Sequence, residues 1–286
     1  MKIKTLHSWF SLPELGYWLS GICWYQHHDP RTSDEKNIEA MQYAIDNWIT
    51  HFDAAEIYWC GHAEKILWEL IKNNNRAELQ ISSKVKGSNC SYEAIKIACK
   101  KSLERLGIDY LDLYYIHWRD KQFDLKDCMK ALDELVDEWL IKNIGVSNFS
   151  VESLKEATSY TQNKIVANQV HYNLIFRECE KWLLEYCQKN DVLLVAYRPL
   201  ELWKLANYGW SDAINIWMQY NKTQAEISLN FLTSQENVVT IFTSTDKQHI
   251  KENLWCLWWK LNSDDMATLK KENKKIIYVS DCIPLG

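Results

Sequence analysis

The sequence predicts a closed (β/α)8 barrel of the TIM type, and two observations lead to this prediction. Strand-like and helix-like segments alternate along nearly all of the 286 residues, and such alternation is typical of a parallel sheet. Eight strand–helix pairs in about 270 residues match the size of a closed barrel. The alternative, an open doubly wound sheet, needs a G-x-G-x-x-G turn after an early strand, and the chain has none.

The predicted strands are short, mainly apolar segments bounded by polar residues. They cover residues 15–21, 49–55, 79–85, 110–117, 141–148, 165–173, 192–197 and 238–243. The predicted helices cover 34–47, 62–74, 91–107, 125–138, 151–160, 179–190, a looser region at 211–232, 247–255, and a trailing segment from 263 to about 275. Ser33 can cap the first helix, and Gly107 closes the third. No linker rich in proline or serine divides the chain, so one domain over residues 1–286 is expected.

Composition excludes several classes of partner. The net charge is −5 without a basic block, so neither a nucleic acid nor a membrane surface is expected to bind. No apolar run approaches the roughly 20 residues of a membrane span, and the first residues do not resemble a signal peptide. The nine cysteines include no C-x-x-C pair and no zinc-ligand spacing. We therefore expect a cytoplasmic protein with reduced thiols and no metal. We also expect a monomer.

Four polar residues stand at the ends of successive predicted strands. Asp53 and Tyr58 follow the second strand, Lys84 ends the third, and His117 ends the fourth. In a (β/α)8 barrel the carboxyl ends of the strands carry the chemistry. The four side chains are therefore predicted to meet at the mouth of the barrel.

An acid, a phenol, an amine and an imidazole form a plausible proton-transfer site. A phenol is a weak acid, with an ordinary pKa of about 10, but a nearby ammonium favours the phenolate. The phenol can then give its proton to a carbonyl oxygen. Each residue alone has a structural explanation, such as a turn cap or a buried histidine. Their occurrence at successive strand ends favours catalysis.

At this point the chain resembles the aldo-keto reductase family over essentially its whole length. The stretch DAAEIY, the strand-end Lys84 and the IHW of the fourth strand match the Asp, Tyr, Lys and His of that family. Three further segments match its fifth, sixth and seventh strands: IGVSNFS (144–150), ANQVHYN (167–173) and VAYRPL (195–200). The resemblance implies a reductase that transfers a hydride from NADPH to an aldehyde, ketone or keto-sugar.

The resemblance also implies which residues hold the cofactor. Ser147, Asn148 and Gln169 would hold the nicotinamide carboxamide, and Tyr197 would stack on the ring. The segment IFTSTDKQHIKEN (241–253) would hold the rest of the cofactor with Thr243, Ser244, His249, Glu252 and Asn253. Thr243 and His249 replace the usual Lys and Arg of the 2′-phosphate site, and Arg198 replaces a small Ser. NADH therefore remains possible beside NADPH.

The glycine and tryptophan counts are unusual. The chain has 8 Gly and 15 Trp, whereas about 20 Gly would be ordinary. Trp48 and Trp139 directly follow predicted helices, where a left-handed glycine is common. Resembling proteins have glycine at the positions of Trp18, Trp24, Trp48, Trp59, Trp68, Trp139 and Trp203, and also at those of Trp255 and Trp258.

These tryptophans suggest a misread codon. UGA encodes Trp in some genetic codes and Gly in others, so translation with the wrong code would produce this pattern. The alternatives are a lineage that truly placed Trp there, or an engineered series of substitutions. Trp18, Trp24 and Trp59 are expected near the cofactor, where an indole would crowd it.

A second function stays open. A nucleotide-binding regulatory subunit could use the same barrel without efficient catalysis. The four strand-end residues favour the enzyme, and turnover of an aldehyde panel separates the two. The substrate itself depends on loops that the pattern does not resolve.

Overall fold

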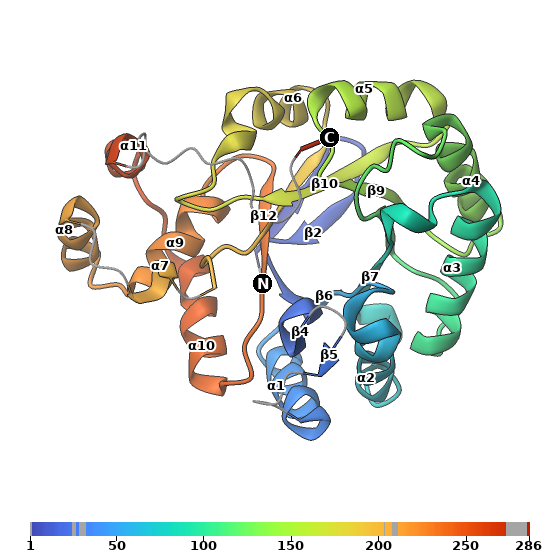
Figure 1. Cartoon of the computed structure of the whole chain (residues 1–286). Helices are drawn as coiled ribbons and strands as arrows, with labels where there is room; N and C mark the ends of the chain where they lie inside the picture. Colours follow the sequence, from blue (N-terminus) through green and yellow to red (C-terminus); the bar gives the residue numbers. More distant parts are fainter. Residues whose placement is uncertain (1, 25–26, 29–32, 203, 208–210, 273–284) are drawn as a thin grey trace.

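The barrel predicted from the sequence is present. The computed structural model describes residues 2–24, 27–28, 33–202, 204–207, 211–272 and 285–286. Eight parallel strands close in the order β10-β11-β12-β3-β6-β7-β8-β9. Helices surround the strands on the outside (Figure 1). The predicted (β/α)8 fold is therefore confirmed.

Each barrel strand lies within one predicted strand. The strands are β3 (Leu15–Trp18), β6 (His51–Asp53), β7 (Gln80–Val85), β8 (Leu113–Ile116), β9 (Ile144–Ser147), β10 (Ile165–His171), β11 (Leu193–Tyr197) and β12 (Val238–Phe242). The helices are α1 (Asp34–Asp46), α2 (His62–Ile71), α3 (Tyr92–Leu106), α4 (Leu125–Asp137), α5 (Val151–Tyr160), α6 (Leu183–Lys189), α7 (Lys204–Asn207), α8 (Ser211–Tyr220), α9 (Gln224–Thr233), α10 (Lys247–Trp255) and α11 (Ser263–Glu272). The looser region at 211–232 is thus two helices, α8 and α9.

Apolar side chains fill both sides of the barrel wall. Leu113, Val195 and Ile241 belong to a buried cluster contributed by several barrel strands. A larger cluster contains alternate strand residues and the buried faces of the helices. Successive residues of a strand point to opposite sides, so short apolar strands supply both clusters.

A short hairpin that the sequence did not reveal packs against the amino ends of the strands. It consists of β1 (Ile3–Thr5) and β2 (Ser11–Pro13). Gln80, the first residue of β7, donates from Nε2 to the Ser11 carbonyl at 2.9 Å. Leu12 is buried in the same cluster as Leu113. The strands are three residues long, too short for a detectable alternation.

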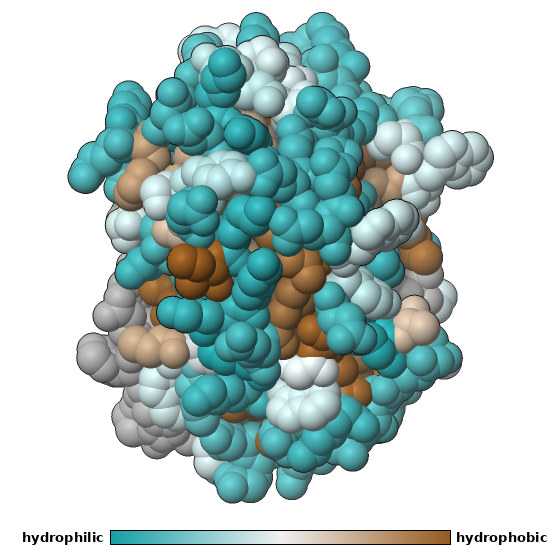
Figure 2. Space-filling view, turned by 90° about the vertical axis from the view of Figure 1, so that its right-hand side faces the viewer, coloured by the Kyte–Doolittle hydropathy of each residue, from teal (hydrophilic) through white to brown (hydrophobic). Residues whose placement is uncertain are grey.

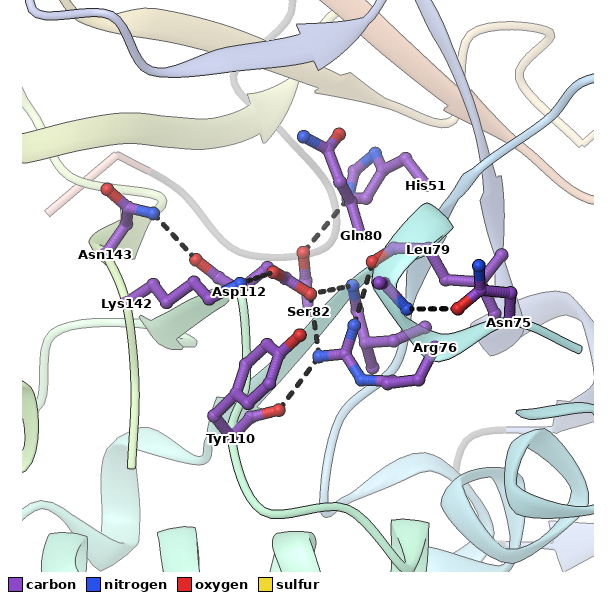
Figure 3. A network of polar contacts seen from close by, with 12 residues as sticks. His51, Asn75, Arg76, Leu79, Gln80, Ser82, Tyr110, Asp112, Lys142 and Asn143 are labelled. Carbon is purple, nitrogen blue, oxygen red and sulfur yellow. Dashed lines mark hydrogen bonds and ion pairs between the residues drawn. The ribbon is translucent and has the colours of Figure 1, made fainter. Parts of the chain in front are cut away.

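A polar network ties neighbouring strands together at this amino end (Figure 3). Arg76 donates to Asp112 Oδ2 at 2.7 Å, and Lys142 Nζ lies 3.0 Å from Asp112 Oδ1. His51 Nε2 and Ser82 Oγ are 3.0 Å apart, and burial lowers the pKa of His51 to about 4. Contacts at this end of a (β/α)8 barrel serve stability, whereas the opposite end carries chemistry.

The face with α2, α3 and α4 is mostly hydrophilic, with smaller hydrophobic areas recessed between polar side chains (Figure 2). Within the described part of the chain, no helix is both long and apolar enough to cross a membrane.

Several tryptophans adopt a backbone conformation that favours glycine. Trp48 has a φ of 69° and Trp139 a φ of 60°, so both predicted left-handed helix ends are confirmed. Trp9 (69°) and Trp59 (48°) are left-handed too, and Trp9 was not among the positions singled out from the sequence. Trp68, Trp255 and Trp258 lie in helical segments, while Trp203 and the Trp24 side chain are outside the described residues.

Candidate active site

The four strand-end residues meet at the carboxyl end of the barrel. Asp53 is the last residue of β6, Lys84 lies near the end of β7, and His117 directly follows β8. These strands are neighbours with parallel pairing, so their ends lie side by side. Tyr58 begins a short 3-10 helix after β6, which returns its phenol to the same place.

The Lys84 ammonium joins two of these residues. It donates to a carboxylate oxygen of Asp53 and to the carbonyl of Ala54, the latter at 2.8 Å. It also lies 3.3 Å from the Tyr58 hydroxyl. The Asp53 and Lys84 side chains are fully buried. Burial lowers the pKa of Lys84, and the Asp53 carboxylate opposes that shift.

His117 lies beside Tyr58 as a neutral ring. The two ring centroids are 5.7 Å apart and the rings are nearly perpendicular. Burial, aided by the charge of Lys84, holds the pKa of His117 well below its usual value. The imidazole is therefore uncharged at neutral pH and can donate one N–H hydrogen bond. Its Nδ1 atom is buried without a hydrogen-bond partner among the described residues.

A chain of buried hydrogen bonds continues from Asp53 across the barrel mouth. Gln169 donates from Nε2 to Asp53 Oδ2 at 3.0 Å. Ser147 Oγ donates to the Gln169 carbonyl at 2.8 Å, and Asn148 Nδ2 donates to Ser147 Oγ at 3.0 Å. The Tyr197 hydroxyl donates to Asn148 Oδ1, also at 3.0 Å. The structure thus brings these sequence-predicted residues into one network with Asp53.

The remaining predicted residues follow β12. They are Thr243, Ser244, His249, Glu252 and Asn253. Tyr17 of β3 donates to the Ser244 carbonyl at 2.7 Å, which ties this turn to the barrel. The Asp246 carboxylate caps α10 and accepts from the backbone of Gln248 and His249. Asn253 is buried, and its Nδ2 atom has no hydrogen-bond partner among the described residues.

A buried pair near Tyr197 was not predicted. His171 Nε2 lies 2.7 Å from Glu201 Oε2, and both side chains are almost fully buried. The His171 ring stacks on Tyr197 with centroids 5.3 Å apart. His171 lies two residues after Gln169 on β10, so alternation along that strand could have placed it at the mouth.

Trp18 is also part of the mouth. Its indole N–H donates to the Tyr58 hydroxyl at 3.0 Å. Its ring lies 5.9 Å from the Tyr197 ring, centroid to centroid. Trp18 ends β3 and pairs in register with Asp53. The indole therefore touches the proposed acid and the aromatic ring expected to bind nicotinamide.

Comparisons with known proteins identify the family of the chain. The sequence model of the aldo/keto reductase family matches residues 15–274. A glyoxal reductase of Bacillus subtilis is 36% identical over 238 residues, covering 82% of this chain and 83% of its own. The chain therefore belongs to the aldo/keto reductase family, and its resemblance to that family is confirmed.

Solved structures give the same assignment. The thermostable aldo-keto reductase Tm1743, solved with the inhibitor epalrestat, has a TM-score of 0.91 and 36% identity, covering 95% of this chain and 100% of its own. An aldo/keto reductase from Klebsiella pneumoniae, solved with NADP and acetate, has a TM-score of 0.84 and 28% identity, covering 94% of each chain. The present chain is accordingly an oxidoreductase of this family.

Proposed function

We propose that this protein reduces the carbonyl group of an aldehyde, ketone or keto-sugar to an alcohol, with Tyr58 as the proton donor. The observation that carries the proposal is the position of the Tyr58 hydroxyl. It lies 3.3 Å from the buried Lys84 ammonium, which is itself paired with Asp53. A fixed positive charge beside a phenol stabilises the phenolate left after proton transfer.

His117 and Lys84 have different roles in this proposal. The neutral His117 ring, beside Tyr58, orients the carbonyl oxygen with an N–H hydrogen bond. Lys84 stays next to the phenol because Asp53 and the Ala54 carbonyl hold its ammonium. Gln169 fixes the second carboxylate oxygen of Asp53. The buried network thus keeps the proton donor in one orientation before substrate arrives.

A nicotinamide dinucleotide supplies the hydride when bound. Ser147, Asn148 and Gln169 are buried amide and hydroxyl groups suited to its carboxamide. The unpartnered Nδ2 of Asn253 fits an acceptor on the nucleotide portion. The polar groups therefore fit the cofactor, but the Trp18 indole lies where its ring would meet Tyr58 and Tyr197.

We propose NADPH as the cofactor, with NADH as the second candidate. The Klebsiella pneumoniae relative was solved with NADP. Thr243 and His249 replace two strongly basic residues, and the Asp246 carboxylate already accepts from the first turn of α10. These features weaken the attraction for a 2′-phosphate. The single domain, the cytoplasmic location and the monomeric state stay predictions.

The first prediction tests Tyr58. Tyr58→Phe should lower kcat by roughly 10²–10⁴-fold, the usual contribution of general acid catalysis, and should leave cofactor affinity nearly unchanged. The parent for this comparison carries Trp18→Gly, because the indole hydrogen-bonds the same hydroxyl. Turnover is measured with a panel of aldehydes that begins with glyoxal, on which the Bacillus subtilis relative is named to act.

Tyr115→Phe is the matched control. The Tyr115 ring lies 5.7 Å from the same Lys84 ammonium, but the proposal gives its hydroxyl no role, so kcat should change little. A Tyr58→Phe variant that keeps more than about a tenth of the parent kcat would remove Tyr58 from the mechanism. A parent that binds cofactor but reduces no carbonyl in the panel would favour the regulatory-subunit alternative.

A further inference from the structure

The Trp18 indole occupies a place that the proposed reaction needs. Its indole N–H donates a hydrogen bond to the Tyr58 hydroxyl. In the proposed reaction this hydroxyl must instead contact the carbonyl oxygen of the substrate. Its ring lies against Tyr197 at 5.9 Å, with 35° between the planes. It also meets the Tyr58 ring edge-on at 6.5 Å. One side chain therefore engages both groups between which a nicotinamide ring and a substrate would have to lie.

One small cavity lies beside the indole. The cavity lined by Trp18, Arg198, Leu200, Phe242 and Thr243 measures about 70 Å³. Small-molecule sites usually measure roughly 300–1,000 Å³. This cavity alone does not admit a nicotinamide ring together with its ribose.

The backbone at position 18 does not itself require glycine. Trp18 ends β3 in regular parallel pairing with β6, and it is absent from the left-handed tryptophans. What a glycine would change here is the volume of the mouth and the freedom of the Tyr58 hydroxyl. Trp18 therefore differs from Trp48 and Trp139, where the left-handed backbone conformation is what favours glycine.

We propose that Trp18 closes the nicotinamide site and that a glycine at position 18 opens it. The inference rests on the proposed function, since it assumes that Tyr58 and Tyr197 border the cofactor ring. With the indole in place, the cofactor can bind only after Trp18 gives up its hydrogen bond and its aromatic contact. The protein that carries Trp18, called the written chain below, is thus a closed form of the enzyme.

The test compares cofactor binding, not turnover. NADPH is titrated into the written chain and into Trp18→Gly by calorimetry, with circular dichroism to verify folding. We expect the glycine variant to bind at least about tenfold more tightly, since a hydrogen bond and an aromatic contact no longer have to break. Equal affinity of the two proteins overturns the proposal.

Two further variants test whether removal of the Trp18 ring causes the gain in NADPH affinity. Trp18→Phe loses the hydrogen bond to Tyr58 but keeps a bulky ring, so its affinity should stay well below that of Trp18→Gly. Trp139→Gly removes an indole that is 82% exposed at the end of α4, and it should leave NADPH affinity unchanged. An equal gain in Trp139→Gly would show that general stabilisation, and not an opened site, caused the effect.

The outcomes also separate this inference from the proposed function. A Trp18→Gly protein that binds NADPH tightly but reduces no carbonyl supports the closed site and contradicts the reductase. If Trp18→Gly does not fold, Trp18→Ala replaces it, because alanine also removes the ring. Failure of the folded small-residue variant to bind better than the written chain overturns the inference.

Discussion

The carboxyl ends of α1, α3 and α4 share one backbone geometry but are closed by different residues. Gly107 closes α3 with a φ of 59°, whereas Trp48 closes α1 at 69° and Trp139 closes α4 at 60°. In all three, the left-handed N–H donates to the carbonyl three residues earlier, and the next N–H donates to the carbonyl five residues earlier. This pair of bonds defines the Schellman motif.

The end of α8 extends the comparison. Asn221 has a φ of 51° and makes the same two backbone bonds. Asparagine visits the left-handed region more easily than other residues with side chains, because its short polar group bonds locally. The fold thus places a left-handed residue at each of these helix ends. Glycine and asparagine adopt this backbone conformation at a low energetic cost, whereas tryptophan adopts it at a higher cost.

Burial does not compensate for the two tryptophans. Trp48 is 66% exposed and Trp139 is 82% exposed, so neither indole gains much from removal from water. Trp9 repeats the situation in the β1–β2 hairpin, with a φ of 69° and 87% exposure. The Leu6 N–H donates to the Phe10 carbonyl, so residues 7–9 form the loop, and a three-residue hairpin loop ordinarily has glycine at its left-handed position. The difference teaches that these sites keep the left-handed backbone typical of glycine, although the residue that occupies them has a large side chain.

The largest expected effect concerns the identity of the residues. We predict that the polypeptide purified from its own source carries glycine at positions 48 and 139. The codon hypothesis explains both the glycine deficit and the left-handed backbone at these ends. Mass spectrometry of peptides spanning residues 44–59 and 130–145 decides the matter, since Trp and Gly differ greatly in mass. Tryptophan in both native peptides would end the codon hypothesis.

The next effect is on stability. The double variant Trp48→Gly, Trp139→Gly should be more stable than the written chain by on the order of 1–2 kcal/mol per site, the cost of a left-handed residue with a side chain. That gain is large against a total of roughly 5–15 kcal/mol. The free energy of unfolding from urea denaturation measures it. An unchanged midpoint would show that the helix ends carry no strain.

The sequence predicted the barrel well because its signal is repeated. All eight strands and their order along the chain follow from alternation of apolar and helical segments. The β1–β2 hairpin was missed because its strands are only three residues long. The break between α8 and α9 was missed as well, because the left-handed Asn221 that divides them resembles an ordinary polar residue in a helical pattern.

The candidate site was predicted in part for the same physical reasons. Strand ends locate Asp53, Lys84 and His117, because parallel neighbours finish at the same edge. The direction of the Trp18 indole could not be predicted, since it depends on how β3 and Tyr58 approach each other across the barrel mouth. The His171–Glu201 pair requires a contact 30 residues apart, which spacing along one strand does not specify.

The smallest expected effect is at Asn221, and it tests whether the comparison depends on the indole. Asn221→Gly should change the free energy of unfolding by no more than about 0.5 kcal/mol, as is usual for exposed sites. Asparagine already tolerates its φ of 51°, and glycine adds freedom to the unfolded chain. Urea denaturation beside the Trp48→Gly, Trp139→Gly variant provides the measurement. A gain at Asn221 equal to the gain per tryptophan would mean that any side chain is strained at these helix ends, so that the contrast between tryptophan and asparagine would no longer hold.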